Sequence, residues 1–254
     1  MTKKRTGAAA VLLLLFVSSC ARLPAPGAAP RLAPPDGGWV ARTLKKMTVE
    51  EKIGQMVACR FAGSFRNADS AYLRELDDLV VKSGIGGLIL FGGEVYETAE
   101  LANAFQKLAK VPLLMASDFE RGTGNQVTGA TLFPPLMSLG AAGSEELAYG
   151  MGRVTALEGR AMGIHMTYAP VVDVNVNPDN PIINTRAVGA DPGLVSRIAN
   201  AFIRGAQDNG MIATAKHFPG HGDTAQDSHS LLPTIEAGLE RLEKVELVPF
   251  KAAV

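Results

Sequence analysis

Residues 211–229 read MIATAKHFPGHGDTAQDSH, and here a short apolar run passes directly into a polar cluster. The run 211–215 follows Gly210, includes two β-branched residues and ends shortly before Pro219. This pattern predicts a buried strand whose carboxyl end carries the polar residues. Because the loops after the strands form the ligand sites of open α/β sheets and (β/α) barrels, we expect the polar cluster to belong to such a site.

Strand and helix patterns alternate along the chain before this stretch. Apolar runs predict further buried strands at residues 56–61, 87–91, 113–116 and 165–172. Helical spacing and capping residues predict a first helix that begins near Thr48. They predict further helices over residues 73–80, 95–109, 144–163 and 191–210. Repeated units of this kind with short connections form a parallel sheet with right-handed crossovers.

Polar residues follow three of the expected strands, namely Asp118, Asp173 and the pair Lys216 and His217. This distribution fits the mouth of a barrel, so we expect an α/β fold of the (β/α)8 TIM-barrel type. The chain supplies only about five strand-and-helix units where a complete barrel has eight, and we expect it to be a fragment truncated after those units. The last segment, residues 240–250, is expected to form a helix interrupted by Pro249.

The first residues have the features of an export signal. A basic start is followed by an apolar run over residues 8–17 and by small residues before Cys20. The sequence VSSC at 17–20 resembles a bacterial lipobox, which implies lipidation of Cys20; a plain secretory signal with an incidental cysteine is the alternative. The predicted organisation is a signal peptide over residues 1–20, an Ala/Pro-rich tether over 21–40 and a folded domain over 41–254. We expect a lipid-anchored protein of the bacterial cell envelope, attached to the membrane through that anchor.

Composition and net charge indicate the class of protein and bear on whether it binds nucleic acid. The chain of 254 residues is 47% hydrophobic and 20% charged, as is usual for a globular protein. Because 25 basic residues balance 25 acidic ones, the net charge gives no electrostatic basis for nucleic-acid binding.

The histidines of the opening stretch allow several interpretations. His217 and His221 have the separation of a helical zinc pair, but Pro219 and Gly220 between them prevent a helix. A metal site on an irregular loop stays open, and so does a role for His221 as a hydrogen-bond partner of the loop backbone. The remaining interpretation pairs Asp227 with His229, since a carboxylate that orients an imidazole makes a general acid/base.

The string KHFPGHGDTAQDSH, residues 216–229, resembles the signature of retaining β-N-acetylglucosaminidases of glycoside hydrolase family 3. The resemblance, which runs from about Thr48 to the C-terminus, implies that His229 is the acid/base and Asp227 its partner. It also implies a set of sugar-binding residues, namely Asp118, Arg186, Lys216 and His217. The implied substrates are N-acetylglucosamine-containing glycans, either peptidoglycan fragments or chitooligosaccharides, and no cofactor or metal is implied.

Two features depart from the family pattern. Where the family usually shows an aspartate, an acid and two glycines, this chain reads DFERGTG at 118–124, so Arg121 and Gln126 are left without an assigned role. A retaining glycosidase also needs a carboxylate nucleophile, which the resemblance places beyond Val254, and we expect the chain alone to show little hydrolysis. A non-catalytic sugar-binding lipoprotein, a metal-dependent hydrolase and a family 3 β-glucosidase remain alternatives.

Overall fold

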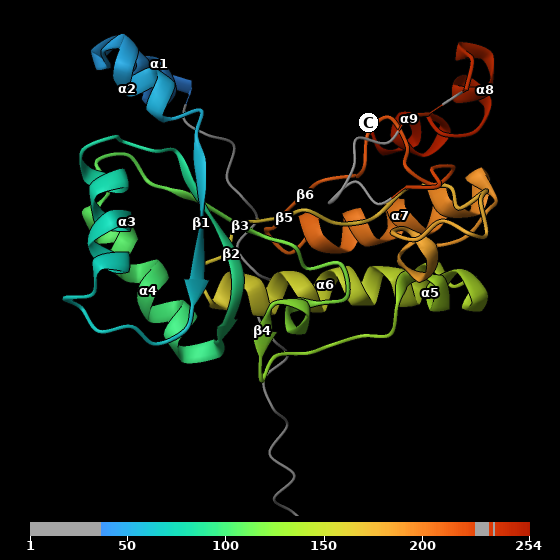
Figure 1. Cartoon of the computed structure of the whole chain (residues 1–254), viewed down its shortest axis with the longest axis horizontal. Coiled ribbons are helices and arrows are strands. Elements are labelled where there is room, and N and C mark those ends of the chain that lie inside the picture. Colours follow the sequence, from blue (N-terminus) through green and yellow to red (C-terminus); the bar gives the residue numbers. More distant parts are fainter. Residues whose placement is uncertain (1–36, 227–233, 236) are drawn as a thin grey trace, which may run out of the picture.

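The computed structural model describes residues 37–226, 234–235 and 237–254. Its centre is a parallel sheet with the strand order β1-β2-β3-β5-β6, in which β4 pairs with β2 (Figure 1). The strands are β1 Ala58–Gly63, β2 Gly87–Glu94, β3 Leu114–Ser117, β4 Val127–Thr128, β5 Met166–Thr167 and β6 Ile212–Ala213. The parallel pairing and the helices between the strands confirm the expected α/β class.

Helices connect successive strands. α3 and α4 lie beside β1 and β2, whereas α6 and α7 pack against each other below β5 and β6 (Figure 1). The helices are α1 Gly37–Lys46, α2 Val49–Gly54, α3 Ala71–Val81, α4 Val95–Leu108, α5 Leu136–Ala142, α6 Glu145–Ala161, α7 Pro192–Gln207, α8 Leu239–Lys244 and α9 Val248–Ala253. Two short 3-10 turns, η1 Thr123–Asn125 and η2 Asn184–Arg186, lie in the loops. Within the described residues, no helix is both long and apolar enough to cross a membrane.

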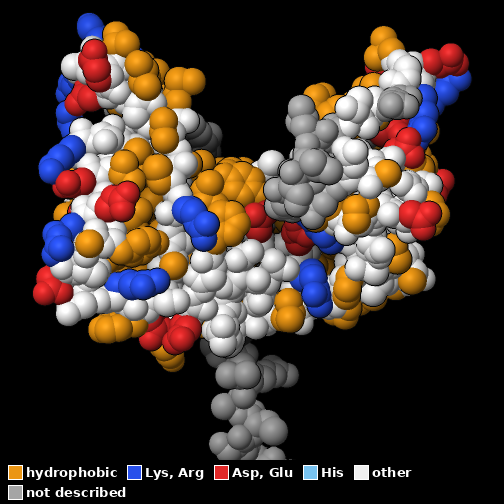
Figure 2. All heavy atoms as spheres, viewed as in Figure 1, with side chains coloured by type: hydrophobic (Ala, Val, Ile, Leu, Met, Phe, Trp, Pro, Cys, Tyr) orange, Lys and Arg blue, Asp and Glu red, His pale blue; other side chains and the backbone are white. Residues whose placement is uncertain are grey.

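The two faces of the sheet differ in burial. Strand register places Phe61, Leu88 and Met115 on the face that the helices cover, and all three are buried. Leu114 and Ile212 lie on the opposite face and are partly exposed. On that side the surface is hollowed between the part that carries α1 and α2 and the part that carries α8 and α9, with hydrophobic side chains at the base (Figure 2).

The expected strand at residues 165–172 was too long. β5 stops at Thr167 because the chain then reaches Pro170, which has no N–H to donate to a ladder. Pairing with the next segment nevertheless resumes, since Lys216 N–H donates to the Pro170 carbonyl at 3.2 Å and Val172 N–H donates to the Lys216 carbonyl at 2.7 Å. This resumed pairing brings the residues that follow Val172 and Lys216 side by side.

The predicted helix starts are confirmed by their caps. Thr48 and Glu51 form a capping box, in which each side chain accepts the other residue's backbone N–H. Ser144 and Asp191 cap α6 and α7. The expected break at Pro249 was misplaced: the C-terminal helix is interrupted before that residue, and Pro249 lies in the first turn of α9, where a missing N–H costs little.

Close contact between α6 and α7 depends on small residues at the crossing. A Cβ on Gly152 of α6 would lie 2.2 Å from the Phe202 carbonyl oxygen of α7. Gly150, two residues earlier in the same helix, has no heavy atom within 4 Å of the equivalent position. Alanine at position 152 would therefore clash with α7, whereas alanine at position 150 would meet no neighbouring atom.

We expect Gly152→Ala to lower the free energy of unfolding by about 1–3 kcal/mol, because α6 and α7 must move apart. Gly150→Ala is the matched control and should raise it by up to about 1 kcal/mol through helix propensity. Urea denaturation followed by circular dichroism measures both changes. Equal effects of the two substitutions would contradict the close crossing of α6 and α7.

Candidate active site

Three of the four predicted sugar-binding residues, Asp118, Lys216 and His217, lie near the carboxyl ends of neighbouring strands, and Arg186 lies on η2. Asp118 directly follows β3, and Asp173 follows the segment that bridges to Lys216 through Val171. His217 comes next in the chain. Because the strands are parallel, these ends meet at one edge of the sheet, and residues nearly 100 positions apart in sequence become neighbours.

Lys216 lies between two carboxylates. Its Nζ is 2.5 Å from Asp118 Oδ1 and 2.6 Å from Glu120 Oε1. The side chain of Lys216 is 14% exposed, so both ion pairs are largely shielded from water. Charge-assisted hydrogen bonds of this kind fix the ammonium group in one position.

Glu120 also holds Arg186, which η2 presents from the opposite side. Arg186 Nε donates to Glu120 Oε2 at 3.0 Å and Nη2 donates to Oε1 at 2.7 Å, a bidentate pair. Burial alone would raise the pKa of Glu120, but the hydrogen bonds and charges of Arg186 and Lys216 outweigh it and lower the pKa to about 2. The hydrogen bonds to Glu120 likewise raise the pKa of Arg186 above its usual value. Glu120 is therefore ionised and joins both cations.

His217 continues the network from Arg186 to a buried carboxylate. Its Nε2 is 3.2 Å from Arg186 Nη2, and its Nδ1 is 2.6 Å from Oδ2 of Asp173, which is fully buried. Since a guanidinium has donors only, we infer that Nε2 presents its lone pair to Arg186 and that Nδ1 carries the proton donated to Asp173. The ring is thus held in one tautomer and one orientation.

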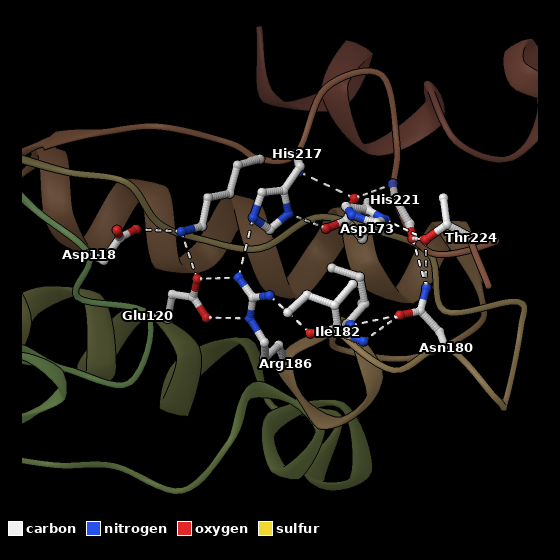
Figure 3. A network of polar contacts seen from close by, with 11 residues as sticks. Asp118, Glu120, Asp173, Asn180, Ile182, Arg186, His217, His221 and Thr224 are labelled. Atoms are coloured by element: carbon white, nitrogen blue, oxygen red, sulfur yellow. Dashed lines mark hydrogen bonds and ion pairs between the residues drawn. The ribbon is translucent and has the colours of Figure 1, made fainter. Parts of the chain in front are cut away.

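The loop after His217 is anchored on the same aspartate. Asp173 Oδ1 accepts the backbone N–H groups of His217 at 3.2 Å and His221 at 2.7 Å. The His221 carbonyl accepts from Asn180 at 2.8 Å, and its Nδ1 lies 2.5 Å from the Thr224 hydroxyl oxygen (Figure 3). These contacts agree with the interpretation of His221 as a partner of the loop. Its Nε2 is buried, with no hydrogen-bond partner among the described residues.

Asn180 also shapes the loop that carries Arg186. Its Oδ1 accepts the backbone N–H groups of Ile182 at 3.0 Å and Ile183 at 2.7 Å. The Ile182 carbonyl in turn accepts from Arg186 Nη1 at 2.9 Å, so the arginine is held at both ends of its guanidinium (Figure 3). One amide side chain therefore links the loop of Arg186 to that of His221.

The network borders a cavity of about 670 Å³, within the roughly 300–1,000 Å³ range of small-molecule sites. Four predicted sugar-binding residues line it together with side chains that had no predicted role; the full lining is Asp118, Glu120, Arg121, Asn125, Gln126, Tyr168, Ile182, Arg186, Lys216, His217 and His221. Burial, and to a smaller degree the charge of Asp118, raise the pKa of Tyr168. The cavity is thus lined by hydrogen-bonding groups on several loops.

The contacts of the His217 ring do not favour the alternative in which the histidines bind a metal ion. Both ring nitrogens of His217 are engaged, by Asp173 and by Arg186, which disfavours His217 as a ligand. Across residues 37–226, 234–235 and 237–254, no cluster of three or more His, Cys, Asp or Glu side chains could hold a metal ion. Asp227, His229 and Cys20 lie outside the described residues, so their roles stay predictions.

Sequence reasoning gave no role to Glu120 or Asn180. Glu120 could have been noticed as the second acid of DFE, but its bridging of two cations depends on partners 66 and 96 residues away. Asn180 lies in a loop without a recognisable pattern. Asp173 was recognised as a strand-end residue, although its place beneath His217 was not foreseen.

Comparisons with known proteins agree with this arrangement. Residues 48–254 match the glycosyl hydrolase family 3 N-terminal domain. The chain is 33% identical over 227 residues to beta-hexosaminidase A of Pseudoalteromonas piscicida, covering 80% of this chain and 38% of that protein. It is 38% identical over 180 residues to the beta-hexosaminidase of Thiobacillus denitrificans, covering 67% and 50%. The chain thus spans half or less of the length of these relatives.

A solved structure shows the same fold. The family 3 beta-N-acetylglucosaminidase from a Paenibacillus species superposes with a TM-score of 0.75 at 40% identity, covering 82% of this chain and 40% of that one. A NagZ structure from Neisseria gonorrhoeae gives 0.68 at 30% identity, covering 77% and 59%. The parallel α/β sheet therefore matches the (β/α)8 barrel-type domain of these proteins.

Proposed function

Because the chain belongs to glycosyl hydrolase family 3, we propose that the enzyme built on it removes terminal β-linked N-acetylglucosamine from glycans by a retaining mechanism. The observation that carries the proposal is the meeting of Asp118, Lys216, Arg186 and His217 in one cavity at the carboxyl ends of the strands. Relatives described as beta-hexosaminidases and a beta-N-acetylglucosaminidase support the choice of sugar.

The polar network supplies both acceptors and donors for a sugar ring. Asp118 is the most exposed of its carboxylates, with 24% of its side chain accessible against 11% for Glu120 and none for Asp173. We assign Asp118 to the sugar hydroxyls and Lys216 and Arg186 to its oxygen acceptors. Glu120 and Asp173 hold these groups in place and thereby reduce the entropy lost when substrate binds.

We assign the proton transfers to His229, oriented by Asp227. In the first step it protonates the glycosidic oxygen, while a carboxylate attacks the anomeric carbon; in the second it deprotonates the water that releases the sugar. His217 is less suited to this task, because its Nδ1 proton is donated to Asp173 and its Nε2 faces Arg186. Asp118, Glu120 and Asp173 are each engaged by a cation or a histidine, so we place the nucleophile outside this set.

The test uses the full-length gene product and two matched substrates, 4-nitrophenyl β-N-acetylglucosaminide and 4-nitrophenyl β-glucoside. We expect a higher kcat/KM for the N-acetyl sugar and, by proton NMR, the β-anomer as the first-formed product, since two displacements restore the configuration. Preference for the glucoside would favour the β-glucosidase alternative. Initial release of the α-anomer would exclude a retaining mechanism, and binding without turnover would favour a sugar-binding protein.

A further inference from the structure

We propose that Glu158 is a positioning residue for sugar binding, which holds the loop after β3 in the conformation that the site needs; the inference rests on the proposed hydrolysis of β-N-acetylglucosaminides. This loop, residues 118–133, begins with Asp118 and Glu120, which line the cavity. Glu158 lies near the C-terminal end of α6 and is not among the residues that line the cavity. Its influence on the sugar therefore passes through the loop.

Three hydrogen-bond donors of the loop converge on the Glu158 carboxylate. Oε2 accepts the Thr131 N–H at 3.1 Å and the hydroxyl of Thr123, and Oε1 accepts the Thr131 hydroxyl at 2.5 Å. Thr123 is fully buried, so its hydroxyl needs a partner inside the protein. One carboxylate thus joins both halves of the loop to α6.

The contacts of Glu158 suit an ionised carboxylate. An ionised carboxylate only accepts hydrogen bonds, and all three of its contacts come from donors. Burial by itself raises the pKa of Glu158, but the hydrogen bonds from Thr123 and Thr131 outweigh it and lower the pKa below its usual value. Among the described residues, no lysine, arginine or histidine forms an ion pair with Glu158. The group is therefore committed to the loop and not to a neighbouring charge.

The two halves of the loop also contact each other where Glu158 holds them. Gly124 N–H donates to the Thr131 carbonyl at 2.8 Å. The halves are so close that a Cβ on Gly122 would lie 2.6 Å from the Thr131 carbonyl oxygen. Thr131 therefore has contacts on both sides, because its N–H and hydroxyl bind Glu158 while its carbonyl binds the other half of the loop.

The first part of the loop carries the anchor of the sugar site. Glu120 lies shortly before Thr123 and binds both Lys216 and Arg186. Movement of this part of the loop would displace Glu120 and both cations with it. The support on the other side is rigid, because α6 packs closely against α7 at Gly152. The Glu158 carboxylate thus connects a fixed helix to the residues assigned to the sugar.

Without this attachment, the substrate must order the loop when it binds. That cost is the same in the substrate complex and in the transition state, so KM rises while kcat is retained. In the full-length enzyme we expect Glu158→Ala to raise KM for 4-nitrophenyl β-N-acetylglucosaminide by about 5–20-fold and to change kcat by less than about threefold. The inhibition constant of the product N-acetylglucosamine should rise by a similar factor.

Glu158→Gln is the conservative variant. Its carbonyl oxygen can accept the Thr131 N–H and the Thr123 hydroxyl, and its amide can donate to the Thr131 hydroxyl oxygen, so KM should stay within about threefold of the wild-type value. Glu146→Ala is the matched control, because it makes the same change at an exposed position of α6, and it should leave KM unchanged.

Thr131→Val tests the same attachment if Glu158→Ala does not fold. It removes one of the three contacts while the side chain keeps its shape, and it should raise KM by about 2–5-fold. Thr131→Ser keeps the hydroxyl and should stay close to the wild-type enzyme. An unchanged KM in both Glu158→Ala and Thr131→Val would overturn the proposal.

Hydrogen exchange separates a positioning role from a general loss of stability. In Glu158→Ala, the amides of residues 121–133 should exchange faster while those of α6 and α7 keep their protection. Faster exchange throughout the protein, or a lower kcat with KM unchanged, would show a structural role only and would also overturn the proposal. Failure of the wild-type enzyme to hydrolyse the aryl glycoside would instead count against the proposed function, and the exchange of residues 121–133 would still decide whether Glu158 holds the loop.

Discussion

His229→Ala is expected to lower the turnover of an aryl β-N-acetylglucosaminide by roughly 10²–10⁴-fold in the full-length enzyme, the usual cost of losing a general acid/base. The effect should be largest for leaving groups of high pKa, which need protonation to depart. A dinitrophenyl glycoside, whose leaving group departs unprotonated, should recover much of the first step. Steady-state kinetics across a series of aryl leaving groups measures this dependence.

Added azide distinguishes loss of the base from loss of structure. A small anion attacks the glycosyl-enzyme without base assistance, so azide should accelerate His229→Ala with the dinitrophenyl substrate and give the β-glycosyl azide. The wild-type enzyme should show no such acceleration. A variant with unchanged turnover would contradict the assignment of His229, and so would an inactive variant that is folded by circular dichroism but is not rescued by azide.

Glu120→Gln is expected to lower the free energy of unfolding near neutral pH by an amount on the order of 3 kcal/mol. The pKa of Glu120 is about 2 in the folded protein against 4.5 for an unperturbed glutamate, so ionisation of this group favours the folded state. Because the folded-state pKa is the lower one, the contribution is complete above pH 4.5 and is lost as the pH falls from 4.5 toward 2. The difference between wild type and variant should shrink over the same interval.

Denaturant unfolding at pH 7 and at pH 3 measures this change. Glu145→Gln is the matched control, because Glu145 faces Arg204 at 3.5 Å on the exposed surface, where ion pairs contribute little to stability. Glutamine at position 120 retains the size of the side chain but removes the ion pair of Arg186 and one of the two ion pairs that Lys216 forms among the described residues. A difference that does not depend on pH would show that packing, and not the charge of Glu120, accounts for the loss.

Local signals gave most of the elements correctly. The capping residues Thr48, Ser144 and Asp191 mark true helix starts, since a cap depends only on groups within one turn. Apolar runs located every strand except β4, which was not expected, and β1 starts two residues later than expected. The errors at residues 165–172 and at Pro249 have one origin, because hydrophobicity does not show where a proline interrupts a ladder or begins a helix.

The sequence by itself determined the class of fold and the family, because strand ends and a long specific string are local features; the family resemblance added Arg186 to the expected set of Asp118, Lys216 and His217. Only the tertiary structure decided that Glu120 joins Lys216 to Arg186 and that Asp173 fixes the tautomer of His217. The physical reason is that these properties depend on distances between loops far apart in the chain. Parallel strand pairing sets those distances, and no local pattern encodes them.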